Sequence, residues 1–251
     1  MSMKLLCVNI EGQKHVDKIR ELLQKENADV VCLAECFPDT IDYLTGGKYP
    51  YRLYVPTYQV DQVEGEGPLG LIPSTTRVWG EAIVSQYPLL DAQTTYLSMD
   101  SYGADNIPTH GTDHHIPALI VANIKMGGET IRVGTVHLTW TPKASMTKRQ
   151  RQNVAELIEL LSGQEIVLAG DFNLPRGNDV YVKMSKYFKD NVPSSIMTTL
   201  DPEFHYTNKG QVKKLELVVD YVWSTPKYLV KSVRVISGVS DHCAITCEIV
   251  I

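Results

Sequence analysis

The stretch that most constrains the fold is a short apolar run that ends on an acid, residues 165–173 (EIVLAGDFN). The apolar residues before Gly170 are uncharged and partly β-branched, which is typical of a strand buried on both faces. If the backbone stays extended through Phe172, the side chains of Asp171 and Asn173 point the same way. Such a strand end is where α/β enzymes place their active sites. A turn is the alternative, because Gly-Asp and Asn-Leu-Pro are common in turns.

The same arrangement recurs twice near the N-terminus. Residues 4–9 (KLLCVN) form an apolar strand that ends on Asn9, and Glu11 follows two positions later. Residues 30–34 form another apolar run, which ends on Glu35. The intervening residues 12–27 carry apolar side chains at helical spacing, which predicts an amphipathic surface helix. Glu35 alone would be an ordinary solvent-facing residue, but a third polar strand end favours a shared site.

Further strands are predicted in the middle of the chain. Residues 80–86, which include Glu81, form one strand, and Gly127-Gly128 joins residues 117–126 and 130–138 in a hairpin. The second arm of this hairpin ends on His137. A capping box, Thr147 with Gln150, then begins a helix that Gly163 ends.

The C-terminal third adds three more strands. In residues 215–223 (LELVVDYVW), Asp220 interrupts the apolar run, and a buried carboxylate needs a cation or a hydrogen-bond donor. Residues 228–236 and 243–251 form the other two strands, and Asp241 and His242 precede the last one.

Two segments lack periodicity, and we expect both to be loops that form a rim. Residues 39–79 are rich in Tyr, Gly and Pro, and their tyrosines could either stack on a substrate or pack on the sheet. Residues 95–117 contain His110, His114 and His115 beside Asp105 and Asp113. A second metal site is one interpretation of this loop, and a solvated loop is the other.

Composition limits the class of protein. The 251 residues show no linker or repeat, so we expect a single domain, 1–251, and a monomer. No run is long and apolar enough to span a membrane and the first residues are not those of a signal peptide, so we expect a cytoplasmic protein. The five cysteines should be reduced, buried thiols and not a zinc site. The net charge of −5 disfavours nonspecific binding to duplex DNA.

Nine polar residues fall at or near predicted strand ends: Asn9, Glu11, Glu35, His137, Asp171, Asn173, Asp220, Asp241 and His242. Hard oxygen ligands of this kind suit Mg²⁺ or Mn²⁺, which bind phosphate-bearing substrates. Such an ion can polarise a phosphoryl oxygen and neutralise the leaving oxyanion. The set therefore predicts phosphoester hydrolysis.

Seven short blocks, in order, carry a resemblance to a known family: VNIEG, LAECF, GEAIVSQYPL, GTVHL, LAGDFN, VVDYVW and VSDHCAI. Together they resemble the endonuclease/exonuclease/phosphatase (deoxyribonuclease I-like) superfamily. This resemblance implies a four-layer α/β sandwich, in which two mixed β-sheets pack face to face with helices outside. It also implies a divalent-metal-dependent phosphodiesterase or nuclease-like enzyme.

The resemblance implies a role for each matching residue. Glu35 would be the main metal ligand, with Asn9 and Asp241. Asp171 would orient or deprotonate the attacking water, and Asn173 would hold a phosphoryl oxygen. Asp220 would orient His242 toward the phosphate, and Glu81 would support His137 at the leaving oxygen. Apart from the resemblance, we expect Arg77, in the Tyr-rich rim, and Trp140 to contact the substrate.

The sequence departs from the family pattern at three positions. Ala34 stands where family members commonly have Gln, and Cys243 stands where an apolar residue or Pro is usual. Glu11 replaces an aromatic residue or Asp, which leaves its expected part in metal binding open.

Function also stays open at the level of substrate. DNA, RNA, phosphotyrosyl-DNA, a lipid head group and an inositol phosphate all remain possible substrates, because a fold alone does not decide among them. A small-molecule or lipid head-group phosphoesterase is therefore one alternative, and a non-catalytic module that binds nucleic acid or protein is another.

Overall fold

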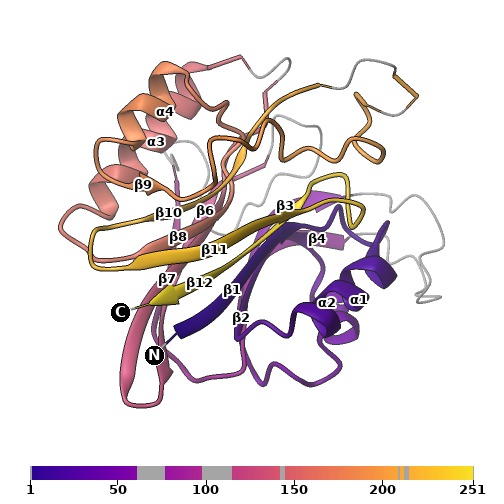
Figure 1. Cartoon of the computed structure of the whole chain (residues 1–251), viewed down its shortest axis with the longest axis vertical. Helices are drawn as coiled ribbons and strands as arrows, with labels where there is room; N and C mark the ends of the chain where they lie inside the picture. The colour runs from indigo at the N-terminus through magenta and orange to yellow at the C-terminus, as the bar shows by residue number, and fades with distance from the viewer. Residues whose placement is uncertain are drawn as a thin grey trace.

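The protein is described here by a computed structural model that covers residues 2–60, 77–97, 115–141, 145–208, 210–211 and 215–250. Two mixed sheets of six strands each form its centre (Figure 1). The first has the strand order β11-β12-β1-β2-β4-β3 and the second β5-β6-β7-β8-β10-β9. The strands are β1 (Ser2–Asn9), β2 (Val30–Cys36), β3 (Tyr51–Val60), β4 (Arg77–Ser85), β5 (Leu89–Tyr96), β6 (Ala118–Met126), β7 (Glu129–His137), β8 (Val167–Asp171), β9 (Lys189–Asp190), β10 (Asp220–Ser224), β11 (Leu229–Ile236) and β12 (Ala244–Val250).

The sheets pack face to face, and helices cover their outer faces (Figure 1). α1 (Val16–Glu26) and α2 (Pro38–Thr45) pack on the first sheet, and α3 (Lys148–Leu160) and α4 (Asp179–Met184) pack on the second. One cluster of buried apolar side chains fills the space between the sheets, and each helical layer has a cluster of its own. The expected four-layer α/β sandwich is therefore confirmed.

Both predicted helices form, and only α1 begins at another residue than expected. α3 begins at the expected capping box, because the Thr147 side chain accepts from the backbone of Gln150 and the Gln150 side chain accepts from Thr147. α1 begins at Val16, four residues later than expected, because Glu11 and Gly12 have positive φ angles and form a turn. Its buried face carries the expected apolar residues and stabilises the helix through packing.

The expectation that residues 39–79 form an irregular loop is wrong for much of that segment. Helix α2 occupies its start, and β3 runs along the edge of the first sheet, antiparallel to β4. The register of this pair shifts between Pro56 and Tyr58, since proline cannot donate to the ladder and is confined to edges and bulges. In residues 95–117, Thr95 and Tyr96 belong to β5, a strand that the sequence did not predict, and residues 98–114 lie outside the described part of the chain.

The strand expected at residues 215–223 is shorter and begins later. β10 starts at Asp220, so this acid lies at the end of the strand and does not interrupt it. The carbonyl groups of Leu217, Val218 and Val219 accept hydrogen bonds from Thr199, Arg176 and Phe172 in neighbouring loops. These bonds replace the ladder that the apolar pattern suggested.

Two further expectations concern the cysteines and membranes. All five cysteines are free and buried, as predicted, and Cys247 lies with Ile245 and Ile249 in the cluster between the sheets. Within the described ranges, no helix has both the length and the apolar character needed to cross a bilayer.

Candidate active site at the ends of the two sheets

Strand register brings the polar residues to one end of the sandwich. β1 and β2 are parallel, as are β7 and β8, so each pair delivers its last residues to the same edge. In the second sheet His137 lies opposite Asp171, and Asp171 lies opposite Asp220 on the antiparallel strand β10. Three of the nine residues therefore meet through backbone pairing alone.

Asn9 connects the two sheets at this edge. Its Nδ2 donates to Glu35 Oε1 at 3.0 Å and to Asp171 Oδ2 at 3.2 Å. Its Oδ1 accepts from the backbone N–H of Glu11 at 3.1 Å. The amide thus holds two carboxylates side by side, in addition to any part in metal binding.

Asp220 and His242 form a buried pair. The Nδ1 of His242 lies 2.9 Å from Asp220 Oδ2 and 3.1 Å from Oδ1. Burial lowers the pKa of His242, but Asp220 and Asp171 raise it by more, so its pKa lies well above the usual range. The imidazole is therefore held as a cation, and Nε2 is the nitrogen left to face a substrate.

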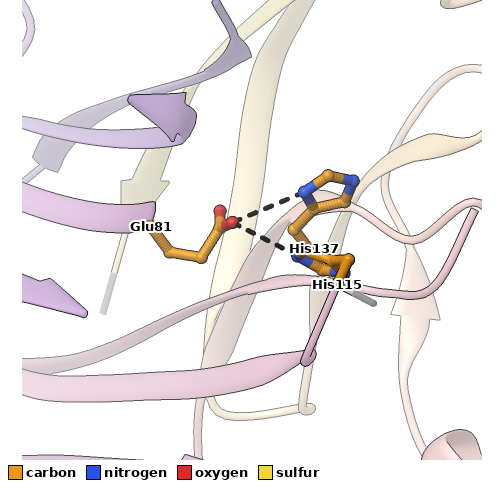
Figure 2. A group of neighbouring side chains, drawn as sticks. All are labelled: Glu81, His115 and His137. Atoms are coloured by element: carbon orange, nitrogen blue, oxygen red, sulfur yellow. Dashed lines mark ion pairs between the residues drawn. The ribbon is translucent and has the colours of Figure 1, made fainter. Parts of the chain in front are cut away.

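A second carboxylate and imidazole pair lies beside the first, and a third ring joins it (Figure 2). The Nδ1 of His137 lies 3.4 Å from Oε1 of Glu81, which is fully buried, and the Nε2 of His115 lies 3.9 Å from the same oxygen. Burial lowers the pKa of His137, but Glu81 first, and then Asp171 and Glu35, raise it to about 10. Burial, with His137 nearby, lowers the pKa of His115 to about 4.

Asp171 and Asn173 reach the cavity through a turn and not through an extended strand. β8 ends at Asp171 and Asn173 has a φ of 47°, so the backbone does not stay extended as that alternation required, yet both side chains line the same cavity. The backbone N–H of Asn173 donates to Asp171 Oδ1 at 2.9 Å, and its side chain donates to the carbonyl of Leu138. The strand and the turn predicted as alternatives for this stretch are both present, because the core strand is followed at once by a turn.

A cavity of about 590 Å³ opens over these groups. Acids and imidazoles occupy part of its lining, and aromatic side chains from loops and edge strands complete it. The aromatic lining residues are Tyr58, Trp79, Trp140 and Tyr206. Trp140, which was expected to contact the substrate, thus lines the cavity. His110, His114 and the side chain of Arg77 lie outside the described part of the structure.

Glu35 is the carboxylate whose surroundings best suit a bound cation. Burial raises its pKa to about 7, and Asp241 adds to this, because neighbouring carboxylates repel one another when both are ionised. Its φ of 55° is unusual for a residue other than glycine and aims the side chain into the cavity. A divalent ion would remove this electrostatic cost, so the donor set fits one. Glu11 also lines the cavity, but its carboxylate contacts Lys14 and, at 3.3 Å, His15.

Among the residues that the structure describes, three groups of donor atoms lie close enough together to bind a metal ion. They are Glu81, His115 and His137; His205, Asp241 and His242; and Asp171, Asp220 and His242. Glu35 does not belong to any of these groups. The donor atoms around an ion at Glu35 would therefore lie farther apart than those within the three groups.

The arrangement agrees with a comparison of the sequence with family models. The model described as the Endonuclease/Exonuclease/phosphatase family matches residues 6–242. The chain belongs to this family. No curated protein sequence shows a significant match to it.

Solved structures of the endonuclease/exonuclease/phosphatase fold superpose on the whole chain. An endonuclease/exonuclease/phosphatase from Beutenbergia cavernae is 18% identical with a TM-score of 0.72, covering 99% of this chain and 71% of its own. A mannosyl-6-phosphatase from Bacteroides thetaiotaomicron is 14% identical with a TM-score of 0.66, covering 99% and 100%. Sphingomyelinase C from Streptomyces griseocarneus is 16% identical with a TM-score of 0.65, covering 99% of both chains.

Several residues at the site of this family member were not singled out from the sequence. His205 stacks edge-on against His242 with ring centroids 5.9 Å apart, and Thr57 Oγ1 donates to Glu81 at 3.3 Å. His115 was noticed only as part of a histidine-rich loop. Neither Thr57 nor His205 follows an apolar run, so no strand-end signal pointed to them.

Proposed function

We propose that this protein is a divalent-metal-dependent phosphoesterase, most closely a phosphodiesterase or nuclease-like hydrolase. The observation that carries this proposal is the convergence of two carboxylate and imidazole pairs, Asp220–His242 and Glu81–His137, on either side of Asp171. A site that only binds a partner has no need to bury mutually repelling acids. Membership of a family of phosphoester hydrolases supports the same reaction.

Asp171 is the group proposed to orient or deprotonate the attacking water. Asn9 and the backbone of Asn173 donate to its two oxygens, which fixes the carboxylate toward the cavity. The His242 cation, held by Asp220, would donate a hydrogen bond to a phosphoryl oxygen as negative charge builds in the transition state.

His137 is the group proposed to act at the leaving oxygen. Its Nε2 lies 3.6 Å from Asp171 Oδ2, on the cavity side, while Nδ1 faces Glu81. An imidazole in the protonated form can transfer a proton to the oxygen that departs. A magnesium or manganese ion bound at Glu35, with Asn9 and Asp241 as further ligands, would stabilise charge on the phosphate oxygens.

The proposal is tested by cleavage of an activated phosphodiester, bis(4-nitrophenyl) phosphate, with Mg²⁺, with Mn²⁺ and with a chelator. We expect turnover that needs the divalent ion and is abolished in Asp171→Ala and His242→Ala. As a matched control, Asp190→Asn removes an acid that binds Arg176 and Tyr181 away from the cavity, and it should retain activity. Absence of metal-dependent turnover in the folded wild type would instead favour a binding module.

A small-molecule or lipid head-group substrate is the second candidate. The cavity of about 590 Å³ has the size of a small-ligand site, and its aromatic lining offers a surface for the part of a substrate beyond the phosphate. The likeness to a mannosyl-6-phosphatase and a sphingomyelinase C supports this breadth. A panel of plasmid DNA, single-stranded DNA, RNA, a phosphotyrosyl oligonucleotide, sphingomyelin, mannose 6-phosphate and an inositol phosphate separates the two classes.

Trp140 offers a direct probe of substrate contact. It lies on the rim and is 38% exposed, so Trp140→Ala should leave folding intact. Loss of one stacking contact should raise KM by about tenfold with kcat little changed. Tyr187→Ala, which removes an exposed aromatic ring away from the cavity, should change neither constant.

A further inference from the structure

The proposed hydrolysis gives no role to His115, whose imidazole ring faces the Glu81–His137 pair. Neither ring nitrogen of His115 has a hydrogen-bond partner among the described residues. The same is true of His137 Nδ1 and of Glu81 Oε2. Buried polar atoms nearly always make hydrogen bonds. Four atoms without one in a single cluster need an explanation, although His137 Nδ1 and His115 Nε2 lie at ion-pair distance from Glu81 Oε1.

The distances within this cluster are compatible with ligands of a single metal ion. Four ligands at about 2.1 Å from a tetrahedral ion lie about 3.4 Å from one another. His137 Nδ1 lies 3.4 Å from Glu81 Oε1, and His115 Nε2 lies 3.9 Å from it. All three donor atoms lie within 4.8 Å of one another. Figure 2 shows both rings directed at one edge of the carboxylate.

Further contacts hold the three ligands in place. Thr57 Oγ1 donates to Glu81 Oε1, and the backbone N–H of Ile116 donates to the carbonyl of Thr57. Arg149 donates to the carbonyl of His115 at 2.9 Å, so the backbone of His115 is tied to helix α3. Outer contacts of this kind orient ligands at protein metal sites.

We propose that Glu81, His115 and His137 form a binding site for a transition-metal ion of the zinc class, separate from the magnesium site proposed at Glu35. Two imidazoles and one carboxylate are a ligand set found in zinc enzymes, whereas Mg²⁺ prefers oxygen ligands. His115 and His137 also line the cavity, so a ligand from the cavity could complete the coordination of the ion. This site goes beyond the proposed hydrolysis and does not depend on it.

Binding would change what His137 can do. The ion takes the place of the Nδ1 proton of His137, which passes to the solvent, while Nε2 keeps its place 3.6 Å from Asp171. A zinc ion would thus be bound to His137, which also belongs to the proposed hydrolytic site. The two sites would share this one imidazole ring.

Metal binding to the full chain, without substrate, tests the proposal. Protein stripped by a chelator is titrated with Zn²⁺ and with Co²⁺ in excess Mg²⁺, and bound metal is counted by mass spectrometry of the desalted protein. We expect one tightly bound Zn²⁺ and the intense visible absorption of four-coordinate Co²⁺. His115→Gln should weaken Zn²⁺ binding at least about 100-fold and remove the Co²⁺ spectrum.

The matched control is His205→Gln, which removes an imidazole from the neighbouring group of donors and should keep the ion. Equal Zn²⁺ binding in wild type and His115→Gln would overturn the proposal, as would loss of the ion only in His205→Gln. If His115→Gln does not fold, anomalous diffraction at the zinc edge from wild-type crystals gives the answer. A peak between Glu81, His115 and His137 supports the site, and a peak elsewhere or none overturns it. Because turnover is not measured, a failed hydrolysis assay leaves this test intact.

Discussion

Asn9 and Asp171 come from different sheets and are 162 positions apart in the sequence, yet the Asn9 Nδ2 donates to Asp171 Oδ2 at 3.2 Å. The same amide donates to Glu35, so a single uncharged side chain ties the half-buried Glu35 to the buried Asp171. The proposed metal site and the proposed base are therefore positioned by one residue.

Replacing Asn9 should destabilise the protein and disorder the acids. Asn9→Ala leaves Glu35 and Asp171 without their shared donor, so the free energy of unfolding should fall by about 1–3 kcal/mol, measured by urea denaturation. Asn123→Ala, which removes an exposed amide that donates to Asp91, should change it by less than about 0.5 kcal/mol. Equal stability of Asn9→Ala and wild type would show that the bridge contributes nothing.

Asp220 is proposed as a positioning residue that acts through His242. Asp220→Asn keeps the shape but removes the charge that raises the pKa of His242, so this pKa should fall in an NMR titration of the imidazole. The value of kcat should drop by a factor of about 100 to 10,000, with KM changed less. An unchanged imidazole titration together with a large loss of kcat would contradict this account.

Stability should respond to pH and to divalent ions through Glu35. Its pKa in the folded protein is raised from 4.5 to about 7, so it binds a proton that the unfolded chain has already lost. Without metal, its contribution to stability is therefore lost as pH rises from about 4.5 through about 7. Mg²⁺ favours the ionised carboxylate and should raise Tm more at pH 8 than at pH 5.5. Glu35→Gln should remove this difference, and an equal effect of Mg²⁺ at both pH values would contradict it.

Gly170 sets the position of Asp171, the proposed catalytic base that follows it. A Cβ at this glycine would lie 2.3 Å from the carbonyl oxygen of Val136 on the neighbouring strand. Gly170→Ala should therefore lower the free energy of unfolding by about 2–3 kcal/mol and reduce turnover by moving Asp171. Gly177→Ala is the control: it also has a positive φ but open space around it, so it should cost about 1 kcal/mol. Similar losses in both variants would mean that backbone strain, and not the clash, is responsible.

Local chemistry made much of the architecture readable from the chain. Runs of apolar residues that stop on a polar one predicted β1, β2 and β8, which end at Asn9, Cys36 and Asp171, because a strand buried on both faces needs continuous apolar side chains. The spacing of apolar residues and the Thr147 capping box predicted α1 and α3 for the same kind of local reason. β3 and β5 were not predicted, because these edge strands carry prolines, tyrosines and polar residues that are also typical of a loop.

The sequence by itself determined the four-layer α/β sandwich, the family and the set of acids and imidazoles gathered at the strand ends. Only the tertiary structure decided which of them lie together: that Asn9 bridges Glu35 and Asp171, and that the His115 ring faces Glu81. The patterns that predict strands and helices depend on residues close together in the sequence, whereas these contacts join residues on different elements. They depend on how the two sheets pack, and that packing is the sum of many buried contacts that no single stretch of sequence contains.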